Sequence, residues 1–326
     1  MKICVYGAGA IGGHLASRLH RGGAEVSIIA RGPHLAAIQA NGLTVHAIDG
    51  EHNARLRATS DPTELGPQDA VFVTVKAPAL RQIAAGIGPL LGRDTAVAFV
   101  MNGIPWWYFD HLAGPHEGKS LPRVDPDDVL RKALGPGRAI GGVVYAASAV
   151  IEPGVIEVEQ TNSRVILGEP DGSMSDRVVA LAGLIAKGGI SGEATPAIRT
   201  EIWNKLIGNL AGGTLAVLTG AAPQTVYTEA AAVRASLATM AEAAAIAQAL
   251  GADPATNHEA RIESQGRMAH KPSILQDLEA GRPMEIDAMF EAPLALARMA
   301  GVPTPTLDLL VALCKIRAES SGLYKR

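Results

Sequence analysis

The chain has 326 residues, of which 48% are hydrophobic and 19% charged, and its 29 basic and 32 acidic side chains give a net charge of −3. A chain of this length is expected to form about two domains of roughly 150 residues each. Because no basic block appears and no stretch reaches the ~20 uninterrupted apolar residues that span a bilayer, we expect neither a nucleic-acid partner nor a membrane-spanning segment.

Strand-like and helix-like patterns alternate through the first hundred residues. The apolar run over residues 70–75 is typical of a strand that is covered on both faces. Strands that alternate with helices predict an α/β domain with a doubly wound parallel sheet of the Rossmann type. The expected strands are 2–6, 25–29, 70–75 and 95–100, and the expected helices are 10–20, 33–39 and 78–87.

The pattern changes in the second half of the chain. Residues 114–137 are rich in proline, glycine and charge, and predict an excursion with a short helix that begins near Asp125 or Asp127. We therefore expect a Rossmann-type dinucleotide-binding domain over residues 1–192 and an all-helical domain over residues 193–326. The further strands are expected at 139–147, 154–159 and 164–167, and the helices at 197–218, 228–250, 254–268, 274–280, 285–300 and 305–320.

A glycine-rich loop follows the first predicted strand. Its sequence is Gly7-Ala8-Gly9-Ala10-Ile11-Gly12, which has the spacing Gly-x-Gly-x-x-Gly. In dinucleotide-binding folds the first glycine makes a tight turn, the second lets the pyrophosphate approach the backbone, and the third allows close helix–strand packing. The spacing alone is a weak signal, but here it lies between a predicted strand and a predicted helix. The loop therefore predicts a cofactor site in which the start of the helix binds pyrophosphate.

The end of the second predicted strand bears on the choice of cofactor. NAD-binding folds carry Asp or Glu about 20 residues after the glycines, where it binds the ribose 2′-hydroxyl. In this sequence Arg31 occupies that region. Because a guanidinium binds a 2′-phosphate through paired hydrogen bonds, we expect NADPH rather than NADH. The alternative is that Arg31 is an ordinary solvated loop residue.

Polar residues also follow two other predicted strands. Lys76 comes after the strand over 70–75, and Asn102-Gly103 comes after the strand over 95–100. Ligands of open α/β sheets bind at the carboxyl ends of the strands, so we expect Lys76 and Asn102 near the nicotinamide half of the cofactor. The plainer interpretations are a solvated lysine and a turn.

The helical half carries the remaining candidates. Lys205 and Asn209 are four residues apart on one predicted helix and so share a face. Ser273 and Glu285 each stand at the start of a later predicted helix. Each of these residues also has a purely structural interpretation. A lysine on a helix is usually a surface residue, a serine can cap a helix, and a carboxylate stabilises the start of one.

Taken together, these residues resemble the ketopantoate reductase (2-dehydropantoate 2-reductase) family. The resemblance runs nearly from end to end, and its most specific pieces are Trp203-Asn204-Lys205-Leu206 and Leu275-Gln276-Asp277 followed by Glu285-Ile286-Asp287. It implies NADPH-dependent reduction of ketopantoate to pantoate, a step in the synthesis of pantothenate and coenzyme A. It also implies that Lys205 is the general acid, that Asn209, Ser273 and Glu285 bind the substrate, and that Asn102 positions cofactor and lysine.

Two features depart from the family pattern. Members with ketopantoate activity often carry an asparagine one turn after the position of Asn209, where this chain has Gly213. In addition, residues 106–109 (Trp-Trp-Tyr-Phe) predict core packing, a dimer contact or an apolar lid over a bulkier substrate. One alternative function is therefore the reduction of a different 2-oxo acid by the same machinery. Another is an NADPH-binding sensor or scaffold without turnover, although a pure sensor has no use for a general acid.

Cysteine and histidine usage bears on the compartment and on metals. The two cysteines, Cys4 and Cys314, stand at opposite ends of the chain, which fits a reducing compartment better than a disulfide framework. The nine histidines lack metal-ligand spacing, so no metal is expected. Since strand pattern begins at residue 2, we expect no signal peptide and a cytoplasmic enzyme. Its partner would be a small 2-oxo acid, and a homodimer is compatible with the sequence.

Overall fold

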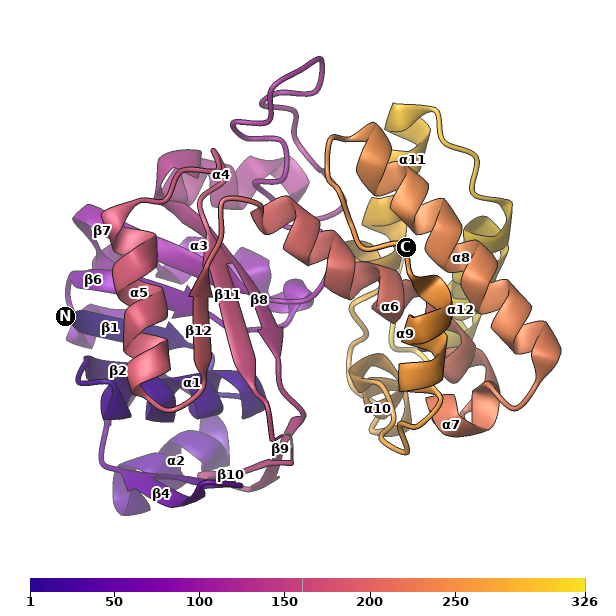
Figure 1. Cartoon of the computed structure of the whole chain (residues 1–326). Helices are drawn as coiled ribbons and strands as arrows, with labels where there is room; N and C mark the ends of the chain where they lie inside the picture. The colour runs from indigo at the N-terminus through magenta and orange to yellow at the C-terminus, as the bar shows by residue number, and fades with distance from the viewer. Residues whose placement is uncertain (160, 326) are drawn as a thin grey trace. The chain divides into compact units, whose positions relative to one another are not determined.

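The computed structural model describes residues 1–159 and 161–325. It divides into two compact units, of which the first comprises residues 1–101 and 105–198 and the second residues 102–104 and 199–326 (Figure 1). The boundary between the units, after residue 198, lies a few residues beyond the boundary after residue 192 that was expected from the sequence. The assignment of residues 102–104 to the helical unit was not foreseen, and it matters for the site described below.

The first unit is built on an eight-stranded sheet with the order β12-β11-β8-β7-β6-β1-β2-β5. All neighbouring strands in it are parallel except β8 and β11. The predicted doubly wound parallel sheet is thus confirmed. Its strands are β1 (Lys2–Tyr6), β2 (Glu25–Ile29), β5 (Arg57–Thr59), β6 (Gln68–Val73), β7 (Leu91–Val100), β8 (Ala139–Tyr145), β11 (Arg164–Gly168) and β12 (Ser191–Ala194).

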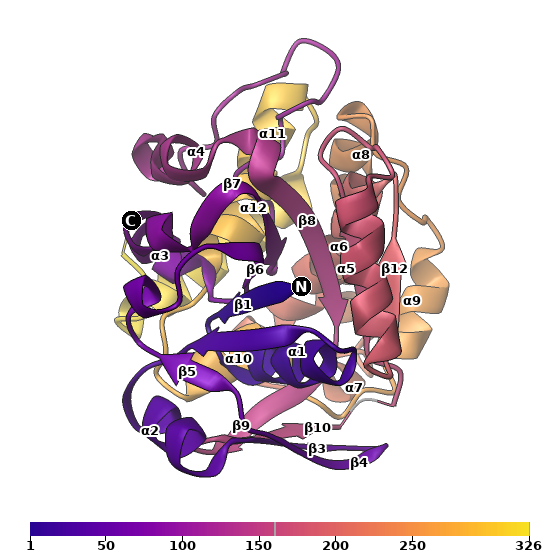
Figure 2. The same cartoon turned by 90° about the vertical axis from the view of Figure 1, so that its left-hand side faces the viewer.

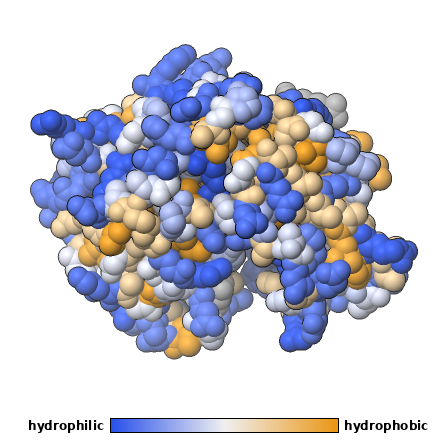
Figure 3. Space-filling view, turned by 45° about the horizontal axis from the view of Figure 1, so that its top comes forward, coloured by the Kyte–Doolittle hydropathy of each residue, from blue (hydrophilic) through white to orange (hydrophobic). Residues whose placement is uncertain are grey.

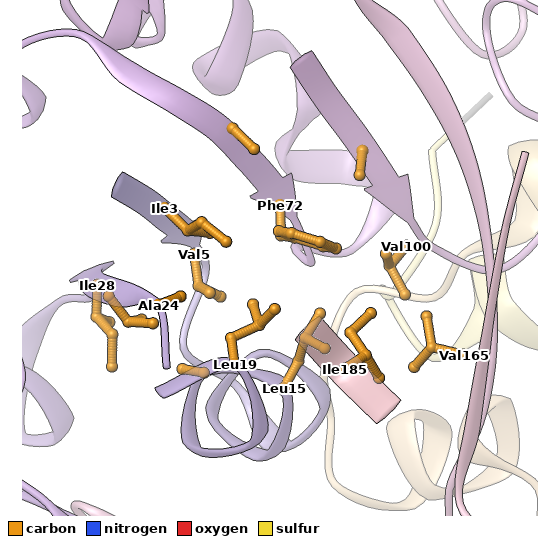
Figure 4. Packing of buried hydrophobic residues seen from close by; sticks show 14 of the residues in the cluster. Ile3, Val5, Leu15, Leu19, Ala24, Ile28, Phe72, Val100, Val165 and Ile185 are labelled. Atoms are coloured by element: carbon orange, nitrogen blue, oxygen red, sulfur yellow. The ribbon is translucent and has the colours of Figure 1, made fainter. Parts of the chain in front are cut away.

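Helices cover both faces of this sheet (Figure 2). On one face, α1 (Ala10–Arg21) packs against α5 (Asp176–Lys187), and on the other α3 (Leu80–Gly86) packs against α4 (Val129–Leu134). A further helix, α2 (Gly32–Asn41), follows β2. Figure 4 shows the core beneath α1 and α5, where sheet residues meet helix residues. The labelled side chains there include Ile3, Val5 and Phe72 from the sheet, and Leu15, Leu19 and Ile185 from the helices.

A second, four-stranded sheet with the order β4-β3-β10-β9 packs beside α1. Only β10 was predicted from the sequence. The outer strand β4 has the sequence Gly-Glu-His-Asn-Ala and is largely exposed, so its hydrophobic pattern does not differ from that of a loop. The helix α5 was also missed, as were β5 and β12. The strands of the second sheet are β3 (Leu43–Ala47), β4 (Gly50–Ala54), β9 (Ser148–Glu152) and β10 (Val155–Val158).

The aromatic run over residues 106–109 belongs to the core of the first unit. Its four side chains are each at most 2% exposed. The Trp106 ring packs edge-on against Phe99 with 5.7 Å between the ring centroids, and Trp107 fills the space that a side chain at Gly141 would need. Core packing is therefore confirmed, whereas the apolar lid and the dimer contact are wrong, because buried side chains cannot cover a substrate or a partner.

The excursion over residues 114–137 carries the expected short helix, α4. Both carboxylate oxygens of Asp125 accept hydrogen bonds from backbone N–H groups in its first turn, those of Leu130 and Arg131, at 2.9 and 3.0 Å. A carboxylate at this position satisfies N–H groups that have no partner within the helix. The helix itself begins at Val129, a few residues after Asp125 and Asp127, near which its start was predicted.

The second unit is all-helical, as predicted. Among the described residues, α8 is long and apolar enough to cross a membrane by length and composition, and it packs against α9, α11 and α12 of this unit. On the face drawn in Figure 3, hydrophobic residues are interspersed with hydrophilic ones. The elements are α6 (Ile198–Thr219), α7 (Pro223–Val226), α8 (Ala230–Ala249), α9 (His258–Gln265), α10 (Ser273–Glu279), the π-helical turn η6 (Asp287–Glu291), α11 (Ala292–Ala300) and α12 (Pro305–Ser320).

Candidate active site

The glycine-rich loop joins β1 to α1 in the first unit. Gly7 has a φ of +108°, and a Cβ added there would lie 2.5 Å from Cγ1 of Val75. A Cβ on Gly12 would lie 2.0 Å from the carbonyl oxygen of Gly7. A Cβ on Gly9, by contrast, would have no atom within 4 Å. Gly7 and Gly12 therefore allow close packing, while Gly9 leaves open space at the start of α1.

The surroundings of this loop suit an anion. No side chain caps the N-terminus of α1, so its first N–H groups are not satisfied by a cap. The hydroxyl of Thr74, just beyond β6, donates to the carbonyl oxygen of Gly7 at 2.7 Å and fixes the loop to the neighbouring strand. The loop also lies where strand order reverses between β1 and β6, the position at which open α/β sheets bind ligands. Thr74 was not singled out in the sequence.

Arg31 and Lys76 both lie beyond the carboxyl ends of strands in the first unit. Arg31 is exposed at the start of α2, and its Nη2 donates to Oε1 of Gln82 in α3 at 3.0 Å. Lys76 is exposed and precedes a short 3₁₀ turn, Ala77–Ala79. The structure thus places Arg31 beside Gln82, a neighbour that could not be inferred from the sequence.

Residues 102–104 bring Asn102 to Lys205 within the helical unit. The Nζ atom of Lys205 donates to Oδ1 of Asn102 at 2.7 Å, although the two residues are 103 positions apart in the chain. Lys205 lies in the second turn of α6 and is half-buried. Both residues were expected in one site, and a direct hydrogen bond joins them in the structure.

Burial and charge set the protonation of this lysine. Burial lowers the pKa of Lys205 from 10.5 to about 8, and the negative charge of Glu285 acts against this shift. Glu285 is itself buried and lies just before η6 instead of inside the first helical turn, where the sequence had placed it. An ammonium whose pKa is close to neutral can stabilise a developing oxyanion and can also give up its proton. This group therefore has the properties of a general acid.

The two other predicted substrate residues are placed less directly. Asn209 lies on α6 one turn beyond Lys205 and is half-buried. Ser273 is exposed and is the first residue of α10, while Pro272 holds the N-cap position. The interpretation of Ser273 as the capping residue is therefore wrong, and its hydroxyl is not used to begin the helix.

Comparisons with known proteins identify the family. The model of the ketopantoate reductase PanE/ApbA matches residues 3–172, and the model of the C-terminal part of the same family matches residues 197–318. The chain belongs to the ketopantoate reductase family. It is 43% identical over 326 residues to the 2-dehydropantoate 2-reductase of Mesorhizobium japonicum, a match that covers 99% of this chain and 100% of the relative.

Solved structures agree with this assignment. A proposed ketopantoate reductase from Ralstonia solanacearum MolK2 superimposes with a TM-score of 0.92 at 41% identity, over 99% of each chain. D-mandelate dehydrogenase, in a ternary structure with NADH and anilino(oxo)acetate, shares the fold with a TM-score of 0.81 at 22% identity, over 99% of this chain and 100% of the other. The chain is thus an oxidoreductase of the ketopantoate reductase family, and it shares its fold with D-mandelate dehydrogenase.

Gly213 marks a departure from the pattern of ketopantoate reductases on α6. A Cβ added to Gly213 would lie 3.4 Å from Cγ2 of Ile274 and 3.8 Å from Cζ of Phe290. These are ordinary van der Waals distances, so a Cβ at this position would fit beside α10 and η6. Both neighbouring side chains are apolar, so the surroundings of Gly213 are apolar.

Proposed function

We propose that the protein catalyses the NADPH-dependent reduction of ketopantoate to pantoate in pantothenate synthesis. The observation that carries this proposal is the hydrogen bond of 2.7 Å between Lys205 and Asn102, made by a lysine whose pKa is lowered to about 8. Lys205 would hold the ketone oxygen through its ammonium and deliver a proton to it as negative charge develops there. Asn102 would keep the ammonium directed at that oxygen.

NADPH, when bound, supplies the hydride that is added to the ketone carbon. The open space at Gly9 and the uncapped start of α1 fit a pyrophosphate, which the backbone from Gly7 to Gly12 would hold. Arg31 would bind the 2′-phosphate, and Lys76 and Asn102 would contact the nicotinamide half. An exposed guanidinium at the end of β2, with no carboxylate in its place, supports NADPH over NADH.

The substrate side of the proposal depends on polar groups of the helical unit. Glu285 would accept a hydrogen bond from the hydroxyl of ketopantoate, and Asn209 and Ser273 would bind the rest of the substrate. A carboxylate is a hydrogen-bond acceptor, and the charge of Glu285 acts on Lys205, which supports a substrate that carries a hydroxyl group beside its ketone. The lack of a side chain at Gly213, beside the apolar side chains of Ile274 and Phe290, instead favours a second candidate, a 2-oxo acid with a larger apolar side chain.

A substrate panel followed at 340 nm separates the candidates. Oxidation of NADPH with ketopantoate supports the proposed reaction, and oxidation only with other aliphatic or aryl 2-oxo acids supports the second candidate. Binding of NADPH without oxidation by any ketone supports a sensor or scaffold. We further infer a cytoplasmic enzyme, because Cys4 and Cys314 are both free thiols. Light scattering will determine whether it is a homodimer.

Changing Arg31 to Ala tests the cofactor assignment. We expect the KM for NADPH to rise about tenfold or more, because a charge-assisted pair of hydrogen bonds to the 2′-phosphate is lost. The KM for NADH should stay within about twofold, since NADH has no such phosphate. Arg55→Ala, at another exposed arginine of the first unit, is the control. Equal effects of Arg31→Ala on both cofactors would contradict the assignment.

A further inference from the structure

The backbone of η6 dictates the conformation of residues 102–104. The N–H of Ile104 donates to the carbonyl oxygen of Ala288 at 2.9 Å. Gly103, which precedes Ile104, has a φ of +87°, and a Cβ added to it would lie 2.4 Å from the same oxygen and 2.6 Å from the carbonyl carbon. Side chains do not approach backbone atoms this closely, so a residue other than glycine would push the segment away from η6.

The Ala288 carbonyl is available for this contact because of the local helix geometry. The N–H of Ala292 donates to the carbonyl of Asp287, the five-residue spacing of a π-turn. In this register the donor for Ala288 would be residue 293, which is a proline and has no N–H. The carbonyl of Ala288 therefore lacks its intrahelical donor, and Ile104 supplies the N–H in its place.

We propose that Gly103 is a positioning residue for Lys205, acting through the Asn102 side chain. Seating Gly103 on the Ala288 carbonyl fixes the neighbouring residue, so that Oδ1 of Asn102 meets the Lys205 ammonium at 2.7 Å. The π-turn and Pro293 together provide the carbonyl group against which residues 102–104 pack. This inference rests on the proposed function, in which Lys205 is the general acid.

The arrangement has a consequence for the charge on Lys205. A carbonyl oxygen that accepts from an ammonium favours the protonated lysine, so loss of the Asn102 contact lowers the pKa of Lys205. Charged groups of other elements lie near this part of α6. Glu285 favours the protonated form, and Arg261 of α9 donates to the backbone carbonyl of Asn204. A general acid is active while it is protonated. The pH above which kcat declines should therefore be lower when the contact between Asn102 and Lys205 is lost.

Gly103→Ala is the first test. We expect kcat to fall about tenfold, as for partial loss of general acid catalysis. The basic limb of the pH–kcat profile should move to lower pH. The matched control is Gly281→Ala, since Gly281 also has a positive φ, +64°, but a Cβ there would meet no atom within 4 Å. This control should keep the wild-type profile.

Asn102→Ala shows whether Gly103 acts through the asparagine. In an Asn102→Ala background, Gly103→Ala should cause no further loss of kcat and no further shift of the basic limb of the pH–kcat profile. A merely structural effect would be additive. Pro293→Ala covers the case in which Gly103→Ala does not fold. The alanine restores a backbone N–H that can donate to the carbonyl oxygen of Ala288 in competition with Ile104. This variant should also move the basic limb of the pH–kcat profile to lower pH.

Titration of Lys205 by NMR, with 13C-labelled lysine, separates this inference from the proposed function. A lower pKa of Lys205 in Gly103→Ala and Pro293→Ala supports the positioning role whatever the substrate is. Unchanged titration and unchanged pH profiles in both variants, or additive losses with Asn102→Ala, would overturn it. If wild type reduces no 2-oxo acid while the NMR shift is present, the proposed function fails and the positioning of Lys205 stands.

Discussion

Changing Lys205 to Ala is expected to lower kcat by about 10³- to 10⁴-fold, while the Kd of NADPH stays within about twofold of wild type. The ammonium is assigned two roles, stabilisation of the oxyanion and delivery of the proton, and alanine can perform neither. The lysine lies in the helical unit, whereas the glycine-rich loop lies in the first unit, so cofactor affinity should be nearly independent of it. Stopped-flow single turnovers with NADPH and fluorescence titration measure the two quantities.

Lys187→Ala is the control for this variant, because Lys187 is also on a helix but is exposed at the end of α5. It should have wild-type kcat and wild-type NADPH affinity. A further variant, Lys205→Met, keeps the length of the side chain and removes only the ammonium. Near-normal turnover in either Lys205 variant would rule out the general-acid role. Loss of NADPH binding in both would show instead that the residue supports the cofactor.

The features that were predictable from the sequence are local. The strand, the glycine loop and the helix over residues 2–21 follow one another without a break, and each has its own signal. The carboxylate cap of Asp125 is local as well. Strands β3 and β4 are short, and β4 is a mostly polar edge strand that pairs with β3. Strand β3 in turn pairs with β10, which is more than a hundred residues away. Hydrophobic periodicity cannot detect such pairs.

The helix α5 differs from these strands, because its sequence does carry the pattern of an amphipathic helix. Its buried residues Val178, Leu181, Ala182 and Ile185 have the spacing of an amphipathic helix, and Ser175 caps it by accepting from the N–H of Val178. This helix could have been predicted and was missed.

For the site itself, the sequence predicted which residues take part but not how they contact one another. Residue types and family resemblance named Asn102, Lys205 and Glu285, but their contacts depend on long-range structure. The φ of Gly103, the π-turn at η6 and the seating of Ile104 on Ala288 arise from packing between segments nearly 200 positions apart. A glycine after an asparagine indicates a turn, and nothing in that dipeptide specifies which carbonyl the turn packs against.

Glu285→Gln is expected to lower kcat/KM about 30-fold, since a hydrogen bond from the substrate to a charged acceptor is replaced by one to a neutral amide. The variant should also change the pH dependence. Burial holds the pKa of Lys205 at about 8, and Glu285 keeps it from falling further. Lys205 loses its proton as pH rises through its pKa, so wild-type kcat should decline above about pH 8. Without the carboxylate the pKa falls, and the decline should begin at lower pH.

The pH–kcat profile distinguishes this electrostatic effect from a lost substrate contact. A contact alone would raise KM and leave the basic limb of kcat in place, whereas loss of the carboxylate charge moves the limb toward lower pH. Glu279→Gln, at an exposed glutamate of α10 that pairs with Lys271, should alter neither quantity and is the control. A limb that moved to higher pH in Glu285→Gln would mean that the carboxylate does not stabilise the ammonium, and that another group holds the pKa of Lys205.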